Sequence, residues 1–180
     1  MDVPLSSVGE VQLEALVGRP PKQPAPEALG TSTLRRAREV AAALGRAWAL
    51  EPQAAEWARE IHCGEVEGMP LQQLRREFAR LWTRNEAQVD ETFAWPGGES
   101  YGEFRARILD GLRATAAAHA GRRVAVVTHA GVISQALGVI RGRAAAVWAA
   151  DRPDPLTATE IIWSNGGPSA VLTFNNSDWY

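Results

Sequence analysis

The sequence contains few of the residues on which several classes of protein depend. Its single cysteine, Cys63, excludes an internal disulfide framework and is typical of a reducing compartment. No apolar run approaches the roughly 20 residues that a membrane-spanning helix requires. The first residues, Met-Asp-Val-Pro, lack the positive and apolar segments of a secretory signal. We therefore expect a cytoplasmic protein that does not interact with a membrane.

The sequence also lacks an excess of charge of one sign. Its 19 lysines and arginines are balanced by 21 acidic residues, which gives a net charge of −2. Such a chain has no basic surface of the kind that nucleic acid requires, so we expect no nucleic-acid partner. The 180 residues are 46% hydrophobic and show no internal repeat. We therefore expect residues 1–180 to form a single domain with a sizeable core.

The most informative stretch runs from Arg123 to Ile133. Its apolar, β-branched first half predicts a strand buried on both faces, and its second half has the periodicity of a helix. His129 and Ala130 stand between the two, at the carboxyl end of a parallel strand, where α/β proteins bind ligands. The first N–H groups of the following helix favour an anion there. His129 is thus either an anion ligand or a residue that only ends the strand, and its position leaves both interpretations open.

Hydrophobic periodicity predicts further elements along the whole chain. The first two expected helices are residues 7–17, with Ser6 or Ser7 as N-cap, and residues 34 to about 45, with Ser32 or Thr33 as N-cap. The third begins with Pro70 as its first residue and continues through Trp82. The fourth is a long helix after Tyr101 that Gly121 closes, and His119 near its end serves as a C-terminal cation. The expected strands are residues 28–30, 48–50, 157–163 and 170–174, with a hairpin turn at Asn165-Gly166-Gly167. Strands that alternate with helices predict a three-layer α/β/α fold with a mostly parallel sheet.

Three arginines, Arg35, Arg36 and Arg38, crowd the start of the second predicted helix. Cations are unfavourable at the positive end of the helix dipole unless an anion is bound there. A solvated basic face is the better interpretation for Arg35 and Arg38, whereas Arg36 remains a candidate anion ligand.

Two predicted loops are further candidates for a site. Residues 56–68 hold four glutamates and two glycines, which fits either a loop that carries chemistry or a solvated acidic loop. The Pro96-Gly97-Gly98 run lets a backbone approach a ligand closely, although it also fits a simple turn. Trp57 and Trp95 beside these loops could pack on an apolar substrate, but such aromatic residues more often belong to a core.

Four separated segments resemble motifs of the histidine phosphatase family, the phosphoglycerate mutase-like superfamily. They are Thr-Ser-Thr-Leu-Arg-Arg-Ala at 31–37, Glu-Ile-His-Cys-Gly-Glu-Val-Glu-Gly at 60–68, Pro-Gly-Gly-Glu-Ser at 96–100 and Val-Thr-His-Ala-Gly-Val at 127–132. Each motif is weak alone, but they occur in the family's order and at plausible spacings. Residues 2–9 and 174–176 are similar to other parts of the family, so the resemblance covers essentially the whole chain.

The resemblance implies a phosphoglycerate mutase-like fold and phosphoryl transfer through a phosphohistidine. It implies that Glu60 is the acid that protonates the leaving oxygen, that His129 contacts the phosphoryl group and that Arg36 binds phosphate. The other substrate-binding residues that it implies are Ser32, Gly98, Glu99, Ser100 and Ala130. The expected partner is a small phosphorylated metabolite. No metal or other cofactor is required, and the sequence shows no metal-ligand cluster.

The sequence departs from the family in one important respect. It contains no Arg-His-Gly motif, which carries the nucleophile at the end of the family's first strand, and its three histidines are His62, His119 and His129. The nucleophile, at least one phosphate-binding arginine and a central strand are therefore missing, about 20 residues by typical element lengths. This chain is predicted to be inactive or very weakly active.

Three explanations for the missing motif stay open. The start of the chain is placed too late, or the gene is truncated, or another segment fills the gap. We favour the first, because Arg36, Glu60 and His129 are present. A sheet without its central strand leaves unpaired backbone groups and an apolar slot, so we expect this chain to be unstable or to oligomerise through the open sheet. A monomer that melts cooperatively well above room temperature would contradict that expectation.

The lengths of the segments between the motifs indicate which branch of the family the chain resembles. The short distance from Arg36 to Glu60 and the lack of large insertions favour a phosphatase over a phosphoglycerate mutase. Residues 96–100 look like those of small broad-specificity phosphatases and of alpha-ribazole phosphatase. The competing function is a non-catalytic protein that binds a phosphorylated ligand. A dinucleotide-binding protein is disfavoured, since no Gly-x-Gly-x-x-Gly follows a predicted strand.

Overall fold

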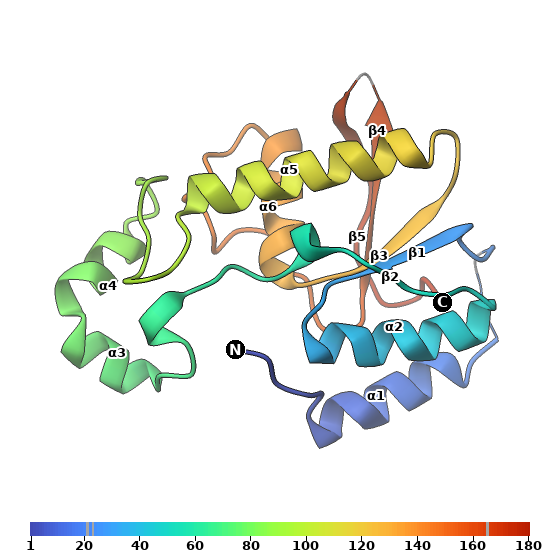
Figure 1. Ribbon diagram of the computed structural model, residues 1–180, viewed down its shortest axis with the longest axis horizontal. Coiled ribbons are helices and arrows are strands. Elements are labelled where there is room, and N and C mark those ends of the chain that lie inside the picture. The colour runs from blue at the N-terminus through green and yellow to red at the C-terminus, as the bar shows by residue number, and fades with distance from the viewer. Residues whose placement is uncertain (21, 23, 165) are drawn as a thin grey trace.

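The computed structural model describes residues 1–20, 22, 24–164 and 166–180, and Figure 1 shows the path of the chain. Its α-helices are α1 (Ser7–Val17), α2 (Arg35–Trp48), α3 (Leu71–Glu77), α4 (Ala79–Glu86), α5 (Tyr101–Ala118) and α6 (Ala130–Ile140). Its strands are β1 (Ala28–Thr31), β2 (Gln53–Ala54), β3 (Val124–Val127), β4 (Ala158–Ser164) and β5 (Gly167–Asn176). Two 3₁₀ turns, η1 (Glu56–Ala58) and η2 (Gly64–Val66), lie in the loop before α3.

The strands form two sheets between layers of helices. β2, β1 and β3 pair in parallel in that order, and β4 pairs with β5 as an antiparallel hairpin. In Figure 1, α1 and α2 lie on one side of the strands, and α5 and α6 lie on the other. Leu29 of β1 packs with Val40 and Leu44 of α2 and with Leu13 of α1 in one buried cluster. This is the three-layer α/β/α arrangement that the sequence predicts.

β3 has a partner strand on only one edge. It pairs with β1, and no described strand pairs with its other edge. Each of its residues, Val124–Val127, is partly exposed, so the prediction of a strand buried on both faces is wrong. The exposure follows from the interrupted sheet, because a strand is fully covered only when it has neighbours on both sides.

α2 is longer than predicted, and residues 48–50 are not a strand. The helix passes through Gly45 to Trp48, and Ala49 then takes a left-handed φ of 55°. Gly45 does not end the helix but makes room for the returning chain, because a Cβ there would lie 2.6 Å from the carbonyl oxygen of Leu50. The strand in this region is β2, which begins at Gln53.

The start of α2 also differs from the prediction. Its N-cap is Leu34, whose side chain makes no capping bond, rather than Ser32 or Thr33. The Ser32 hydroxyl still accepts a hydrogen bond from the Leu34 N–H at 3.3 Å. The prediction of Ser32 or Thr33 as N-cap is therefore wrong, and the helix starts one or two residues later than predicted.

The predicted helix from Pro70 is two helices. Phe78, with φ −117° and ψ 34°, separates α3 from α4, and Pro70 is the N-cap rather than the first helical residue. This break turns the pair, which stands at one end of α5 in Figure 1. Its apolar residues Leu74, Phe78, Leu81 and Trp82 pack against the cluster around Phe93 and Trp95.

The remaining elements lie close to where the sequence places them. Ser6 rather than Ser7 caps α1, and its hydroxyl accepts a hydrogen bond from the Gly9 N–H at 3.1 Å. His119 is the C-cap residue of α5. The predicted hairpin turn between β4 and β5 begins at Asn165, which lies outside the described residues. None of the described helices is long and apolar enough to cross a membrane.

Candidate active site

His129 lies where β3 meets α6, as the N-cap residue of that helix. Its side chain is almost fully buried, and its Nε2 lies 2.7 Å from the Ser32 hydroxyl oxygen. Burial first, and then the positive charges of Arg36 and Arg59, lower the pKa of His129 to about 4. The imidazole is therefore neutral near pH 7 when no anion is bound.

Glu60 lies on the same helix end as His129. One oxygen of its carboxylate accepts a hydrogen bond from the Gly131 N–H of α6 at 3.1 Å, and the other accepts one from the Ile61 N–H at 3.0 Å. Gly131 makes this approach possible, because a Cβ there would lie 2.1 Å from a Glu60 oxygen. The glycine in the segment after His129 thus serves to place a carboxyl group from a distant loop.

Two guanidinium groups face this end of α6. Arg36 is half-buried and donates a hydrogen bond to the Met1 carbonyl at 3.2 Å. Arg59 is exposed and pairs with Glu56 at 3.3 Å. Both lower the pKa of His129, which shows that their positive charges act at the imidazole.

The two arginines beside Arg36 point elsewhere, as predicted. Arg35 and Arg38 are exposed, and Arg35 pairs with Glu39 one turn further along α2 at 2.8 Å. A solvated basic face describes them well.

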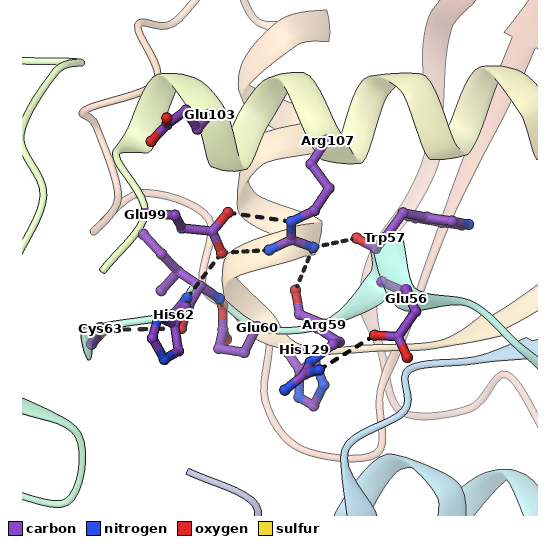
Figure 2. Close-up of polar contacts among 12 residues, drawn as sticks. Glu56, Trp57, Arg59, Glu60, His62, Cys63, Glu99, Glu103, Arg107 and His129 are labelled. Carbon is purple, nitrogen blue, oxygen red and sulfur yellow. Dashed lines mark hydrogen bonds and ion pairs between the residues drawn. The ribbon is translucent and has the colours of Figure 1, made fainter. Parts of the chain in front are cut away.

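Glu99 is held by an arginine that the sequence did not single out. Figure 2 shows the Arg107 guanidinium between the Glu99 carboxylate and the carbonyl groups of Trp57 and Arg59. Arg107 donates to the two Glu99 oxygens at 2.6 and 3.2 Å and to the two carbonyl oxygens at 2.7 and 3.2 Å. Glu99 also accepts a hydrogen bond from the His62 N–H at 2.9 Å. This network fixes the backbone on both sides of Glu60 against α5.

Three of the predicted substrate-binding residues cap a helix, start a helix or allow two loops to pack closely. Ser100 is the N-cap of α5 and forms a capping box with Glu103. Gly98 lies where a Cβ would come within 2.6 Å of the His62 carbonyl oxygen, so the close approach of its backbone is to a neighbouring loop. Ala130 is the first residue of α6.

A single cavity of about 1160 Å³ opens beside these residues. Of the predicted site residues, Arg36, Glu60 and Glu99 line it, whereas His129, Ser32, Gly98, Ser100 and Ala130 do not. Arg59, Arg107 and Gly131 also line it. The structure thus gathers the predicted acid and arginine on the cavity wall, whereas His129 and Ser32 are buried and bonded to each other outside the lining.

Sequence reasoning missed Arg59 and Arg107. Arg59 could have been suspected because it directly precedes Glu60. Arg107 carries no such signal, since it lies on a regular helix and its partners are some 8 to 50 residues away in the sequence. Cys63 also lines the cavity, but burial, and then Glu67, raise the pKa of its thiol to about 11, so it is not a thiolate at neutral pH.

The arrangement suits an anion that carries several oxygens. Two guanidiniums, the start of α6 and a carboxyl group converge on the polar end of the cavity. The described residues bring together no group of three side chains that could hold a metal ion. Cationic donors and a helix N-terminus stabilise charge on phosphoryl oxygens, and a carboxyl group beside them can transfer a proton.

The chain matches the family model of the histidine phosphatase superfamily (branch 1) over residues 1–176. It therefore belongs to that superfamily, as its motifs predicted. The phosphoglycerate mutase-like protein 4 of Arabidopsis thaliana is 31% identical over 137 residues, which cover 74% of this chain and 58% of that protein. The chain thus spans little more than half the length of this curated relative.

Solved structures of the same fold cover nearly all of the chain. The mycobacterial glucosyl-3-phosphoglycerate phosphatase is 26% identical with a TM-score of 0.80, over 98% of this chain and 89% of that one. The alpha-ribazole phosphatase of Shigella flexneri is 18% identical with a TM-score of 0.81, over 98% of this chain and 87% of that one. These comparisons confirm the predicted fold.

Proposed function

We propose that this site binds the phosphoryl group of a small phosphorylated metabolite and that, together with a histidine nucleophile, it hydrolyses a phosphomonoester. The carrying observation is that the Glu60 carboxyl group is bonded to the first turn of α6, the helix that His129 caps, and lines one cavity with Arg36. The likeness to a solved phosphatase at 26% identity supports hydrolysis over transfer between metabolites.

Each residue has a defined task in this reaction. A histidine nitrogen attacks phosphorus and the ester P–O bond breaks, while Glu60 in its acid form gives its proton to the leaving oxygen. Water then attacks the phosphohistidine, the P–N bond breaks and Glu60 takes up the proton of the water. Arg36 and Arg59 offset the negative charge on the transferring oxygens. A phosphoryl dianion would also raise the pKa of His129, so that the imidazole becomes a charged donor.

The nucleophile is the open part of the proposal. None of the three histidines of this chain lies in an Arg-His-Gly motif, so the phosphohistidine step needs a histidine that these residues do not supply in that form. Without it, the same pocket supports the second candidate function, a non-catalytic protein that binds a phosphorylated ligand. Both functions require that the polar end of the cavity binds phosphate.

The intact mass of the protein from its natural host distinguishes the two functions. A mass above 19.5 kDa by about one strand and one loop indicates a longer form, which is the form to assay for phosphatase activity. In that form, Glu60→Gln and His129→Ala should each lower kcat on the order of a hundredfold, while the control Glu160→Gln on β4 leaves it unchanged. Full activity in either site variant would refute the role given to that residue.

If the mass equals that of this chain, a binding experiment replaces the assay. Inorganic phosphate should then bind to the chain, and this binding should weaken in Arg36→Gln without any phosphohistidine being formed. Failure of phosphate to bind would refute both candidate functions.

A further inference from the structure

The cavity has a second end whose chemistry differs from that of the polar end. Part of its lining consists of apolar and aromatic side chains that pack together in one cluster: Val66, Leu74, Trp82, Trp95, Tyr101 and Trp148. These residues come from η2, α3, α4, the start of α5 and the loops around them. Figure 1 shows α3 and α4 beside the first turns of α5, and these helices contribute Leu74, Trp82 and Tyr101 to the lining.

The aromatic walls are held in place by the packing behind them. The Trp95 ring makes edge-to-face contacts with Phe93 at 5.1 Å and with Phe78 at 6.3 Å between centroids. The indole N–H of Trp148 donates to the Asn85 carbonyl oxygen at 3.1 Å. Trp82 is only partly buried, with the Arg75 guanidinium 4.8 Å from its ring. Rigid aromatic faces of this kind bind flat apolar groups with little loss of conformational entropy.

Asn85 is a polar side chain beside the aromatic lining. It is 6% exposed and lines the cavity, and its side-chain oxygen accepts a hydrogen bond from the Tyr101 hydroxyl at 2.5 Å. Burial raises the pKa of Tyr101, so the phenol stays protonated and fixes the orientation of the amide. The amide nitrogen of Asn85 donates to no described residue. The aromatic end therefore offers a ligand one directed hydrogen-bond donor.

We propose that this aromatic end binds the leaving group of the phosphomonoester, and that the leaving group is a flat ring system with a hydrogen-bond acceptor. The inference rests on the proposed function, because the phosphoryl group must occupy the polar end. A flat apolar ring covers more of the aromatic walls than a sugar does, since each hydroxyl group of a sugar requires a polar partner when it is buried. A ring with a single acceptor satisfies both the aromatic walls and the Asn85 amide.

Phosphonates that cannot be hydrolysed test this on the chain as it is. We would titrate inorganic phosphate, methylphosphonate, naphthylmethylphosphonate and the isomeric quinolinylmethylphosphonates while following tryptophan fluorescence. Naphthylmethylphosphonate should bind at least about tenfold more tightly than methylphosphonate. At least one quinoline isomer should bind more tightly still, because its ring nitrogen can accept the hydrogen bond from Asn85. Inorganic phosphate should displace all of them.

Two variants assign the gain to the aromatic end. Trp82→Ala should remove most of the advantage of the ring ligands and leave methylphosphonate binding unchanged, whereas Trp163→Ala on β4 should affect neither. Equal affinities for methylphosphonate and naphthylmethylphosphonate, or an unaltered ring advantage in Trp82→Ala, would overturn the inference while the proposed function stands. Equal affinities for naphthylmethylphosphonate and for every quinolinylmethylphosphonate would overturn the role of Asn85. If neither phosphate nor any phosphonate binds, the proposed function itself fails.

Discussion

Replacing Arg107 with methionine should destabilise the protein far more than its helical position suggests. The substitution keeps a long apolar stem but removes the donors to Glu99, Trp57 and Arg59. The side chains of Arg107 and Glu99 are 29% and 19% exposed, so water can replace only part of what is lost. Breaking a fully buried pair costs about 3–5 kcal/mol and an exposed pair less than about 1 kcal/mol. We therefore expect a loss of about 2–3 kcal/mol.

Urea unfolding measures this loss, and Arg113→Met on the same helix is the matched control. Arg113 pairs with Asp110 at 2.6 Å, but both side chains are more than half exposed, so the control should stay within about 0.5 kcal/mol of wild type. For a domain of this size the Arg107 variant should also melt about 5–10 °C lower. Its activity or ligand binding should weaken as well, because the backbone before Glu60 loses its anchor on α5.

A double-mutant cycle with Glu99→Gln shows whether the pair itself is responsible. If the two residues act together, the double variant should be less destabilised than the sum of the single variants by about 1–2 kcal/mol. Additive single effects, or an Arg107→Met variant as stable as Arg113→Met, would refute the reasoning.

Two further predictions concern the start of α6. Gly131→Ala should destabilise the protein by about 1–3 kcal/mol, because the added Cβ would lie 2.1 Å from a Glu60 oxygen. The loss is expected although alanine is the better helix former. The control Gly102→Ala in the first turn of α5 should be tolerated, since the nearest atom to its Cβ is 3.4 Å away. Urea unfolding checks this, and adding Glu60→Ala to Gly131→Ala should restore the lost stability if the clash is the cause. The pKa of about 4 for His129 lies below the ordinary histidine value. Between about pH 6.5 and pH 4 the unfolded chain therefore binds a proton that the folded protein does not. The free energy of unfolding should fall by about 3 kcal/mol as the pH drops through this range. His129→Gln should lack that part of the pH dependence in urea unfolding, and the same slope in both proteins would contradict the assignment.

Local sequence patterns predicted the elements but not all of their ends. Gly45 has the sequence signature of a helix stop, yet the helix continues because the glycine is needed for the approach of Leu50. Ser100 shows the opposite case, because Ser100 and Glu103 have the spacing of a capping box, which is the role that the structure gives them. Local chemistry therefore explained Ser100 better than its position within a family motif did.

The candidate site was predictable where its residues belong to ordered motifs. Glu60, Arg36 and His129 come from three distant segments, and the structure brings them to one helix end. Arg107 and Asn85 could not have been found this way. Both lie on regular helices, where arginine and asparagine are usually solvated, and only the folded chain shows that they are enclosed by loops far away in the sequence.

α5 fixes the distance between the two ends of the cavity and therefore the length of the ligands that fit it. Its first residue, Tyr101, lines the aromatic end, and Arg107 anchors the segment that carries Glu60, the proposed proton donor. Arg107 lies six positions after Tyr101 on a regular helix, a fixed interval of about 9 Å along the axis. A rigid helix cannot shorten or stretch this interval. The cavity should therefore select ligands by the distance between their ring and their phosphorus atom. A ligand whose spacer is one or two bonds too long or too short should bind weakly even when it carries both the ring and the phosphoryl group.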